Sequence, residues 1–364
     1  MNKIDLIDLG ISDRYIQEAT LYGENLYMAR VSVQHKDMYR VITEGGEIKA
    51  EVSGKLSHSA TISADYPAVG DWVLVDRMED KAGNAIIHHV LTRKSCFERK
   101  APGSKQETQI IATNIDTIFI CMSLNNDYNL RRLERYISIA WDSMATPVVL
   151  LTKSDLCQDV SGKLSEIETV ALGADVIVTS SLSGDGYSDV LKYLKKGKTV
   201  AFIGSSGVGK STLINKLMGE EVLVTNGIRD DDKGRHTTTH RELFVLPHGG
   251  IVIDTPGMRE IQIAGADLSK SFADIEELAQ SCFFGNCKHK SEPKCAVKKA
   301  IEEGMLSQDR LTSYEKLQKE MRFEELKATM GVERAGKQRM IEVLGSPGAA
   351  KKIQQANRKN KGNK

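Results

Sequence analysis

The sequence predicts a multidomain protein in which a small β-barrel, an α/β domain and a mostly helical region follow one another. Three observations lead to this fold class. Short strand-like segments fill the first 100 residues or so, apolar runs alternate with helical stretches from about residue 106, and apolar strands stop after about residue 266. We place domains at 1–105, 106–265 and 266–345, followed by a polar tail at 346–364 that we expect to be disordered.

Length and composition agree with several soluble domains. The chain has 364 residues, of which 40% are hydrophobic and 27% charged, ordinary values for a globular protein. No apolar run approaches the roughly 20 residues that a membrane-spanning helix needs. The N-terminal residues lack the pattern of a secretory signal. We therefore expect a cytoplasmic protein that makes no membrane contact and is monomeric.

The first domain contains strand-like segments separated by turn residues. These segments lie at 26–33, 38–44, 47–52 and 71–78. About five strands in roughly 75 residues fit a Greek-key barrel of the OB type. Another kind of small barrel is the alternative.

The central domain alternates apolar and helical segments, which predicts a parallel sheet covered by helices on both faces. The apolar runs lie at 117–124, 146–152, 175–181 and 199–204, and the helical stretches at 129–143, 162–172 and 187–196. Two further runs, at 241–247 and 250–257, are separated by turn residues and predict a β-hairpin.

A phosphate-binding loop follows the run at 199–204. Glycines let backbone N–H groups surround phosphate oxygens, and the N-terminus of the next helix adds partial positive charge. We expect Lys210 to contact the β- and γ-phosphates and to act in catalysis, and Ser211 to bind Mg²⁺. A glycine-rich turn without a ligand is the alternative. The residues that match G-x-x-x-x-G-K-[ST], with the next residue of the helix, are Gly204, Ser205, Ser206, Gly207, Val208, Gly209, Lys210, Ser211 and Thr212.

Two later segments complete the predicted phosphate site. An Asp-Thr-Pro-Gly turn follows a strand, so Asp254 can hold the Mg²⁺ shell through water and the Gly257 N–H can contact the γ-phosphate. Between the P-loop and this turn, the segment 234–239 contains three threonines, and one of them can close over the γ-phosphate and bind Mg²⁺ as a switch loop. We favour Thr238 for this role, with Thr237 as the second candidate. The start of an ordinary strand is the alternative.

Two segments at the ends of earlier strands predict the recognition of guanine. The first is Thr152-Lys153-Ser154-Asp155, which resembles the N-K-x-D sequence of GTPases with threonine in place of asparagine. Asp155 can accept hydrogen bonds from the guanine N1–H and 2-amino groups, a donor pair that adenine lacks. Ser180 and Ser181 belong to a second segment that resembles the S-A-K guanine loop. A common helix-start sequence is the alternative for residues 153–155.

The order of these motifs is informative. The guanine-recognition segments precede the P-loop, whereas ordinary GTPases place them after it. The same sheet forms if the chain is circularly permuted, with new ends before the strand at 117 and after Gly257. The turn that senses the γ-phosphate then leads directly into the C-terminal region.

Three of the six cysteines crowd together beside a histidine in the C-terminal region. Cys282, Cys287, His289 and Cys295 have the spacing C-x4-C-x-H-x5-C, which favours a metal site over a disulfide framework. Three thiolates and one imidazole complete a tetrahedral zinc shell and leave no open position for catalysis. We therefore predict one structural Zn²⁺ per chain. A reduced set of buried thiols is the alternative.

Taken together, the motifs resemble those of the RsgA type of circularly permuted GTPase, which acts in late maturation of the small ribosomal subunit. The resemblance implies an OB barrel, a central GTPase and a zinc domain. It also implies binding to the 30S subunit and its rRNA, with hydrolysis of GTP to GDP and phosphate stimulated there. Thr152 departs from the family pattern. The resemblance covers nearly the whole chain and rests on AVGDWV at 68–73, TKSD at 152–155, GSSGVGKST at 204–212, GRHTTTH at 234–240, DTPGMRE at 254–260 and the cysteine cluster.

Met258 stands where many GTPases have the glutamine that orients the attacking water. The resemblance implies a hydrophobic residue at this place, so we expect intrinsic hydrolysis to be slow. His236, beside the switch threonines, is our candidate for positioning the water. A role in the folding of the switch loop is the alternative.

Two other classes of function compete with an RNA-dependent GTPase. A P-loop kinase needs an acceptor site and an arginine-rich lid, which we do not find in the sequence. An RNA-binding module with a vestigial nucleotide site is disfavoured by the intact Lys210, Ser211 and Asp254. The last 14 residues hold six Lys/Arg and no acid, which suggests either an anionic partner or a solvated terminus.

Overall fold

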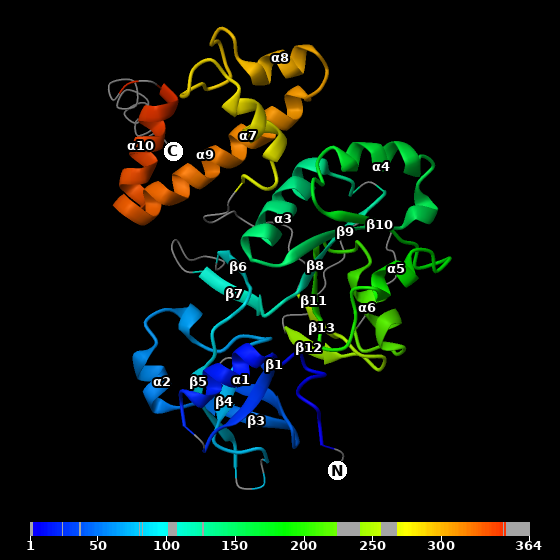
Figure 1. Cartoon of the computed structure of the whole chain (residues 1–364), viewed down its shortest axis with the longest axis vertical. Helices are drawn as coiled ribbons and strands as arrows, with labels where there is room; N and C mark the ends of the chain where they lie inside the picture. Colours follow the sequence, from blue (N-terminus) through cyan, green and yellow to red (C-terminus); the bar gives the residue numbers. More distant parts are fainter. Residues whose placement is uncertain are drawn as a thin grey trace, which may run out of the picture. The chain divides into compact units, whose positions relative to one another are not determined.

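The computed structural model describes residues 3–23, 25–35, 38–79, 81, 83–100, 108–125, 127–223, 241–255, 268–344 and 346. The chain divides into two compact units (Figure 1). The first comprises Met1–Lys100, Glu107–Gln262 and Ser269–Ala273, and the second consists mainly of Asp274–Lys364. The barrel and the α/β domain belong to the first unit, and the helical region belongs to the second.

Five strands near the N-terminus close into a barrel. They pair in the order β1-β2-β3-β5-β4, and β4 pairs back onto β1. The β3–β5 pair is parallel and the other pairs are antiparallel. A closed barrel of five strands confirms the fold predicted for this region. The strands are β1 (Tyr27–Gln34), β2 (Tyr39–Thr43), β3 (Gly46–Val52), β4 (Trp72–Val75) and β5 (Ala85–Val90).

Alternate residues of the strands fill the barrel. Ala29, Val31 and Val33 of β1 are buried together with Val41 and Ile87, as expected for strands that turn one face to a core. Short helices flank the barrel: α1 (Asp13–Thr20), α2 (Gly54–Ser59) and the 3-10 helix η1 (Ser63–Asp65).

The outer face of β1 carries a buried arginine. Arg30 is only 1% exposed, and burial lowers its pKa to about 10. Its guanidinium donates hydrogen bonds to the Thr199 hydroxyl at 2.9 Å and to the backbone oxygens of Leu9, Gly70 and Asn114. Because Thr199 begins β11, these bonds join the barrel to the strand that leads to the P-loop.

Six strands form the sheet of the central α/β domain. Their order is β10-β9-β8-β11-β13-β12, and all neighbours are parallel except β12 and β13. The predicted parallel sheet and hairpin are therefore confirmed. β12 also meets β1 through the pair Val33–Glu242, which makes the barrel strands and the central strands continuous. The strands are β8 (Thr117–Ser123), β9 (Thr146–Thr152), β10 (Asp175–Val178), β11 (Thr199–Gly204), β12 (Glu242–Val245) and β13 (Ile251–Asp254).

Helices alternate with these strands. The Asn129 side chain caps α3 by accepting from the Arg132 N–H at 2.9 Å. α4 and α5 end four and five residues before their predicted ends. The chain then passes through Gly173 before β10 and Gly197 before β11, both with positive φ. The elements are α3 (Leu130–Asp142), α4 (Val160–Glu168), α5 (Tyr187–Leu191), α6 (Lys210–Met218) and the 3-10 helix η2 (Ser154–Leu156). A separate antiparallel pair, β6 (Cys96–Lys100) and β7 (Thr108–Thr113), lies between barrel and sheet in the chain.

The strand order is that of a permuted sheet. β11 precedes the P-loop and lies between β8 and β13, although three parallel strands come before it in the chain. The strands that lead to the predicted guanine-recognition segments, β9 and β10, are among those three. Because the strands are parallel, the carboxyl ends of β9, β10, β11 and β13 lie along one edge of the sheet, where α/β proteins bind ligands.

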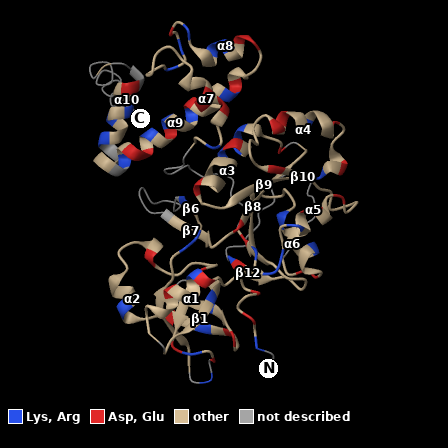
Figure 2. Cartoon of the chain, viewed as in Figure 1, with Lys and Arg blue, Asp and Glu red and all other residues tan. Residues whose placement is uncertain are grey.

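The second unit is helical. Its helices are α7 (Ala273–Gln280), α8 (Ala296–Glu302), α9 (Gln308–Met330) and α10 (Val332–Leu344). These helices agree with the mostly helical region predicted after about residue 266, and α9 is rich in charged residues. Its basic and acidic side chains are interspersed (Figure 2), and pairs such as Lys327–Glu324 at 2.7 Å join neighbouring turns. Arg310, which is 3% exposed, donates two hydrogen bonds to Asp274 at 2.6 and 2.8 Å and so ties α9 to α7.

No helix among the described residues is long and apolar enough to cross a membrane. Apart from Ser346, the predicted tail at 346–364 lies outside the described residues.

Candidate nucleotide and metal sites

The P-loop connects β11 to α6, and its backbone explains its glycines. Gly204, Gly207 and Gly209 have φ of 145°, 79° and 98°, a region that side chains other than glycine rarely adopt. At Gly204 a Cβ atom would also lie 2.4 Å from the Cys121 carbonyl oxygen. Gly209 caps α6, so the N-terminus of this helix opens toward the loop. The loop thus has the form that presents backbone N–H groups to an anion.

Lys210 is the buried cation of this loop. It is 8% exposed, and its ammonium group donates to the carbonyl oxygens of Gly204 at 2.8 Å and Ser205 at 2.7 Å. Burial lowers the pKa of Lys210, and the nearby carboxylate of Asp254 partly opposes this shift. The side chain is therefore folded over the loop, where its charge faces the space that the loop encloses. Ser211 and Thr212 follow in the first turn of α6.

Asp254 ends β13 beside the P-loop strand. It lies opposite Phe202 in the β11–β13 register and is 5% exposed. Burial raises the pKa of Asp254 to about 6, against the opposing charge of Lys210. Asp254 makes no ion pair within the described part of the chain. A buried carboxylate in this situation suits the water shell of a divalent cation, which would favour its charged form.

The two segments predicted to recognise guanine come together beside the P-loop. The Thr152 hydroxyl, at the end of β9, donates a 2.6 Å hydrogen bond to the carbonyl oxygen of Val208 in the P-loop. This bond spans 56 residues of sequence and is buried. The threonine that departs from the GTPase pattern therefore ties the base-recognition segment to the phosphate-binding loop. Sequence reasoning did not identify this contact.

Asp155 is oriented by the second segment. The Ser180 hydroxyl donates to the Asp155 carboxylate at 2.6 Å, and the Ser180 oxygen accepts from the N–H groups of Leu182 and Ser183 at 3.2 Å. The left-handed Lys153, with φ 58°, turns the chain so that the Ser154 N–H donates to the Thr179 carbonyl oxygen at 3.3 Å. The Asp155 carboxylate is thus held by Ser180, which follows the end of β10. Ser181, by contrast, has an exposed side chain.

Several predicted site residues cannot be placed. Thr237, Thr238, His236, Gly257 and Met258 lie outside the described residues. Their roles stay predictions.

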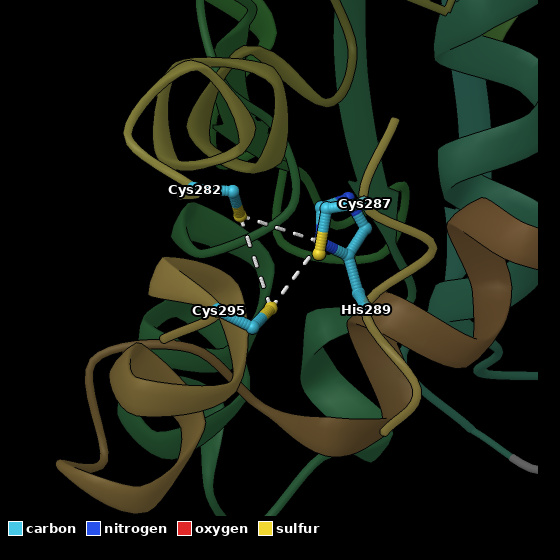
Figure 3. A group of neighbouring side chains, drawn as sticks. All are labelled: Cys282, Cys287, His289 and Cys295. Atoms are coloured by element: carbon cyan, nitrogen blue, oxygen red, sulfur yellow. Dashed lines mark hydrogen bonds between the residues drawn. The ribbon is translucent and has the colours of Figure 1, made fainter. Parts of the chain in front are cut away.

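The four predicted metal ligands come together in the second unit (Figure 3). Cys282, Cys287, His289 and Cys295 bring three sulfurs and one imidazole nitrogen within 4.8 Å of one another. The Cys282 and Cys295 sulfurs are 3.8 Å apart, and the His289 Nδ1 lies 3.7 Å from the first and 3.4 Å from the second. The cluster can hold one metal ion.

Two features of the backbone support this cluster. Cys295 caps α8, and its sulfur accepts from the Lys298 N–H at 3.5 Å, so a thiolate there faces the positive end of the helix. Glu292 organises the loop that carries His289, since its carboxylate accepts from the N–H groups of Lys288, Lys290 and Ser291 at 2.8–3.0 Å. The C-x4-C-x-H-x5-C spacing alone gave no sign of this role of Glu292.

Comparison with family models gives two matches. A family model described as RsgA GTPase matches residues 90–264. A model for ABC transporters matches residues 187–354, a stretch that includes the P-loop but not β8, β9 or β10. Since a P-loop occurs in many nucleotide-binding families, this second match adds nothing about the base-recognition segments.

Proteins of known name resemble the chain over almost its full length. "Small ribosomal subunit biogenesis GTPase RsgA 2" of Lactiplantibacillus plantarum is 50% identical over 354 residues, which are 97% of this chain and 98% of the relative. "Small ribosomal subunit biogenesis GTPase RsgA" of Opitutus terrae is 42% identical over 91% of this chain and 94% of the relative.

Two solved structures have a similar fold at 26% sequence identity. YjeQ from Thermotoga maritima has a TM-score of 0.60 and covers 80% of this chain and 97% of its own. YloQ, described as a circularly permuted GTPase, has a TM-score of 0.58 with coverage of 80% and 93%. The permuted sheet, the P-loop and the full-length relatives thus agree, and the chain belongs to the RsgA family of circularly permuted GTPases, hydrolases that act on GTP.

Proposed function

We propose that this GTPase binds the 30S ribosomal subunit and its rRNA, assists late maturation of that subunit, and hydrolyses GTP to GDP and phosphate with stimulation by the subunit. The observation that carries the proposal is the assembly of P-loop, Asp254 and both guanine-recognition segments at one edge of a permuted sheet. The relatives named for small-subunit biogenesis support the choice of partner.

In this proposal the phosphates lie in the P-loop. The backbone N–H groups of residues 204–209 and the N-terminus of α6 bind phosphate oxygens. Lys210 exchanges its two carbonyl acceptors for oxygens of the β- and γ-phosphates. Ser211, Thr238 and, through water, Asp254 would hold Mg²⁺, which neutralises charge on the β- and γ-phosphate oxygens. The Gly257 N–H senses the γ-phosphate.

The base is selected by Asp155. Its carboxylate, held by Ser180, accepts from the guanine N1–H and 2-amino groups. The Lys153 side chain lies along the base, and Thr152 fixes the distance between base and phosphate sites through Val208. Because adenine offers no matching pair of donors, GTP is preferred to ATP.

Hydrolysis needs an oriented water. Met258 has no hydrogen-bonding group for that task. We propose His236 for it, with slow intrinsic turnover; a role of His236 in ordering the switch loop is the competing assignment.

The distances in the cysteine cluster support zinc. A tetrahedral ion with Zn–S near 2.3 Å and Zn–N near 2.0–2.1 Å separates two sulfurs by about 3.8 Å and a sulfur from a nitrogen by about 3.6 Å. In the cluster, the Cys282 and Cys295 sulfurs are 3.8 Å apart, and the His289 Nδ1 lies 3.7 and 3.4 Å from them. Four protein ligands fill the shell, so we assign a structural Zn²⁺ that holds the loops before α8.

We further propose domain limits at 1–105, 106–265 and 266–345, and a cytoplasmic monomer. A small-molecule P-loop kinase remains less well supported, because it requires an acceptor site that neither the sequence nor the described residues reveal.

The test is GTP turnover by the full chain with and without purified 30S subunits. We expect slow GTP turnover by the wild-type chain alone and faster turnover with 30S subunits. Lys210→Ala should hydrolyse no GTP, either alone or with 30S subunits. Free 50S subunits are the matched control. Equal turnover by the wild type alone, with 30S and with 50S subunits would contradict the proposed partner. Undiminished turnover by Lys210→Ala would contradict the proposed nucleotide site.

A further inference from the structure

A cavity of about 270 Å³ lies in the described part of the first unit, where the end of β1 meets the start of β12. It is separate from the P-loop, since none of its lining residues belongs to the nucleotide site. Its walls come from the barrel, from β7 and from the residue before β12. The polar residues that line it are Gln34, His35, Ser63, Tyr66, Gln109 and Arg241.

The charge of this cavity is positive. No acidic residue lines it within the described residues, and Arg241 supplies a guanidinium. Arg241 Nη1 donates to the Ile110 carbonyl oxygen at 2.7 Å, which anchors the side chain in the wall. Burial and the nearby Arg99 lower the pKa of Arg241 to about 10.

Arg99 adds a second cation. It donates to the Gln109 side-chain oxygen at 3.1 and 3.2 Å, and Gln109 lines the cavity. Neither Arg99 nor Arg241 forms an ion pair with a carboxylate among the described residues. Two guanidinium groups that repel each other are stabilised by an anion between or beside them, and phosphate oxygens match guanidinium geometry.

The other walls suit the rest of a nucleotide. Tyr66 and His35 offer rings on which a base can stack. The Gln34 amide can donate to and accept from base edges, and the Gln109 NH₂ group can donate to them. The volume is close to the lower end for small-ligand sites, about 300 Å³, and so admits one nucleotide rather than a helix. His35 opens the β1–β2 connection, the loop with which OB barrels contact oligonucleotides.

We propose that this cavity binds one nucleotide of single-stranded RNA, with Arg241 holding its phosphate. The inference rests on the proposed function, because the ribosomal partner supplies the RNA. The site is connected to the GTP site through β12. Arg241 follows Thr238 by three residues, and its neighbour Glu242 lies opposite Asp254 in the β12–β13 register. RNA bound at Arg241 therefore acts on the strand that joins the predicted switch to the Mg²⁺-binding aspartate.

The experiment measures binding of a fluorescein-labelled single-stranded hexaribonucleotide to the full chain by anisotropy at one fixed salt concentration. We expect Arg241→Gln to weaken binding roughly ten- to a hundredfold, the loss typical of a hydrogen bond to a charged group. Tyr66→Leu should weaken it roughly five- to a hundredfold through lost stacking. The control is Arg40→Gln, which removes an exposed charge of β2 paired with Glu47 and should change the affinity less than twofold.

Each result of this experiment supports or overturns the proposed RNA site. Equal losses in Arg241→Gln and Arg40→Gln would overturn the site, because only bulk charge would then matter. If Arg241→Gln does not fold, as judged by circular dichroism, Tyr66→Leu decides instead, and wild-type affinity in that variant overturns the site. Uridine monophosphate should compete only at much higher concentration than the hexamer. Competition at equal concentration would show that the ligand is a free nucleotide and that the RNA assignment is wrong.

The same variants separate this inference from the proposed function. With 30S subunits, Arg241→Gln should lose most of the stimulation of GTP turnover and retain the unstimulated rate. If 30S stimulates neither the wild type nor the variant, the proposed function fails. If 30S subunits stimulate the wild type and Arg241→Gln equally, and the hexamer binds the two proteins equally, the proposed RNA site is wrong and the proposed function stands.

Discussion

The contact between Thr152 and Val208 offers a direct test of how the base and phosphate sites are joined. Thr152→Val keeps the shape of the side chain and removes the hydroxyl that donates to the Val208 carbonyl oxygen at 2.6 Å. Thr152 is 5% exposed and Val208 is 1% exposed, so water has little access to the carbonyl that loses its partner.

The size of the effect follows from that burial. Leaving a buried acceptor without its donor costs about 1–3 kcal/mol. The bond is present without nucleotide, so part of this cost lowers the free energy of unfolding. The remaining part of the cost weakens nucleotide binding, because a P-loop that has lost this hydrogen bond must be ordered when phosphate binds. Each 1.4 kcal/mol that falls on binding weakens it about tenfold. Since Val208 lies in the P-loop and not at the γ-phosphate-sensing turn, GTP and GDP should lose affinity by similar factors.

The assay combines two measurements on the same protein: chemical unfolding without nucleotide, and GDP and GTP-analogue affinity by calorimetry. Thr179→Val is the matched control, because the Thr179 hydroxyl donates to the Leu151 carbonyl oxygen at 3.3 Å within the sheet and does not contact the P-loop. Thr152→Asn should keep the affinity, since its amide can donate to the same oxygen. The reasoning is refuted if Thr152→Val and Thr179→Val have the same nucleotide affinities, or if only GTP affinity falls.

Three further outcomes can be measured. Asp155→Asn should shift preference from guanosine toward xanthosine triphosphate in a competition assay, since the amide donates to the xanthine O2; an unchanged GTP preference would place base recognition elsewhere. Freshly purified protein should contain about one zinc per chain by elemental analysis, and Cys282→Ser should lose it without loss of GDP binding. Glu292→Gln should speed zinc transfer to a chelator tenfold or more. The Lys290 N–H and its neighbours hold the pKa of Glu292 at about 2, so the carboxylate is charged above about pH 4 and this effect should be the same at pH 6 and pH 8.

The parts of the fold that the sequence predicted are those with a local signal. Alternating strand residues predicted the barrel, and apolar runs of six to eight residues predicted the parallel sheet. Motif order predicted the permutation because the predicted guanine-recognition segments precede the P-loop in the chain. The four metal ligands lie within 14 residues, so their spacing alone indicated that they meet.

The contacts that could not be predicted join residues far apart in the chain. Thr152 and Val208 are 56 residues apart, and Ser180 and Asp155 are 25 apart. Thr152, Ser180 and Asp155 are common polar residues with many plausible partners, and only the order of strands in the sheet decides which partner lies beside each of them. The same holds for Arg241, which has the appearance of an ordinary surface arginine at the start of a strand.

Arg30 shows why a period of two in a strand is not enough to assign exposure. Alternation in β1 places Val31 and Val33 inside the barrel and therefore turns Arg30 outward, which for an isolated barrel means into water. In this chain the outer face of β1 is covered, and Arg30 is 1% exposed. Burying a guanidinium is costly unless its N–H groups find acceptors. The Thr199 hydroxyl and three backbone oxygens supply them. Because these acceptors come from four separate segments, the arginine is satisfied only when the barrel and the P-loop strand are packed together, and its burial couples the folding of the two.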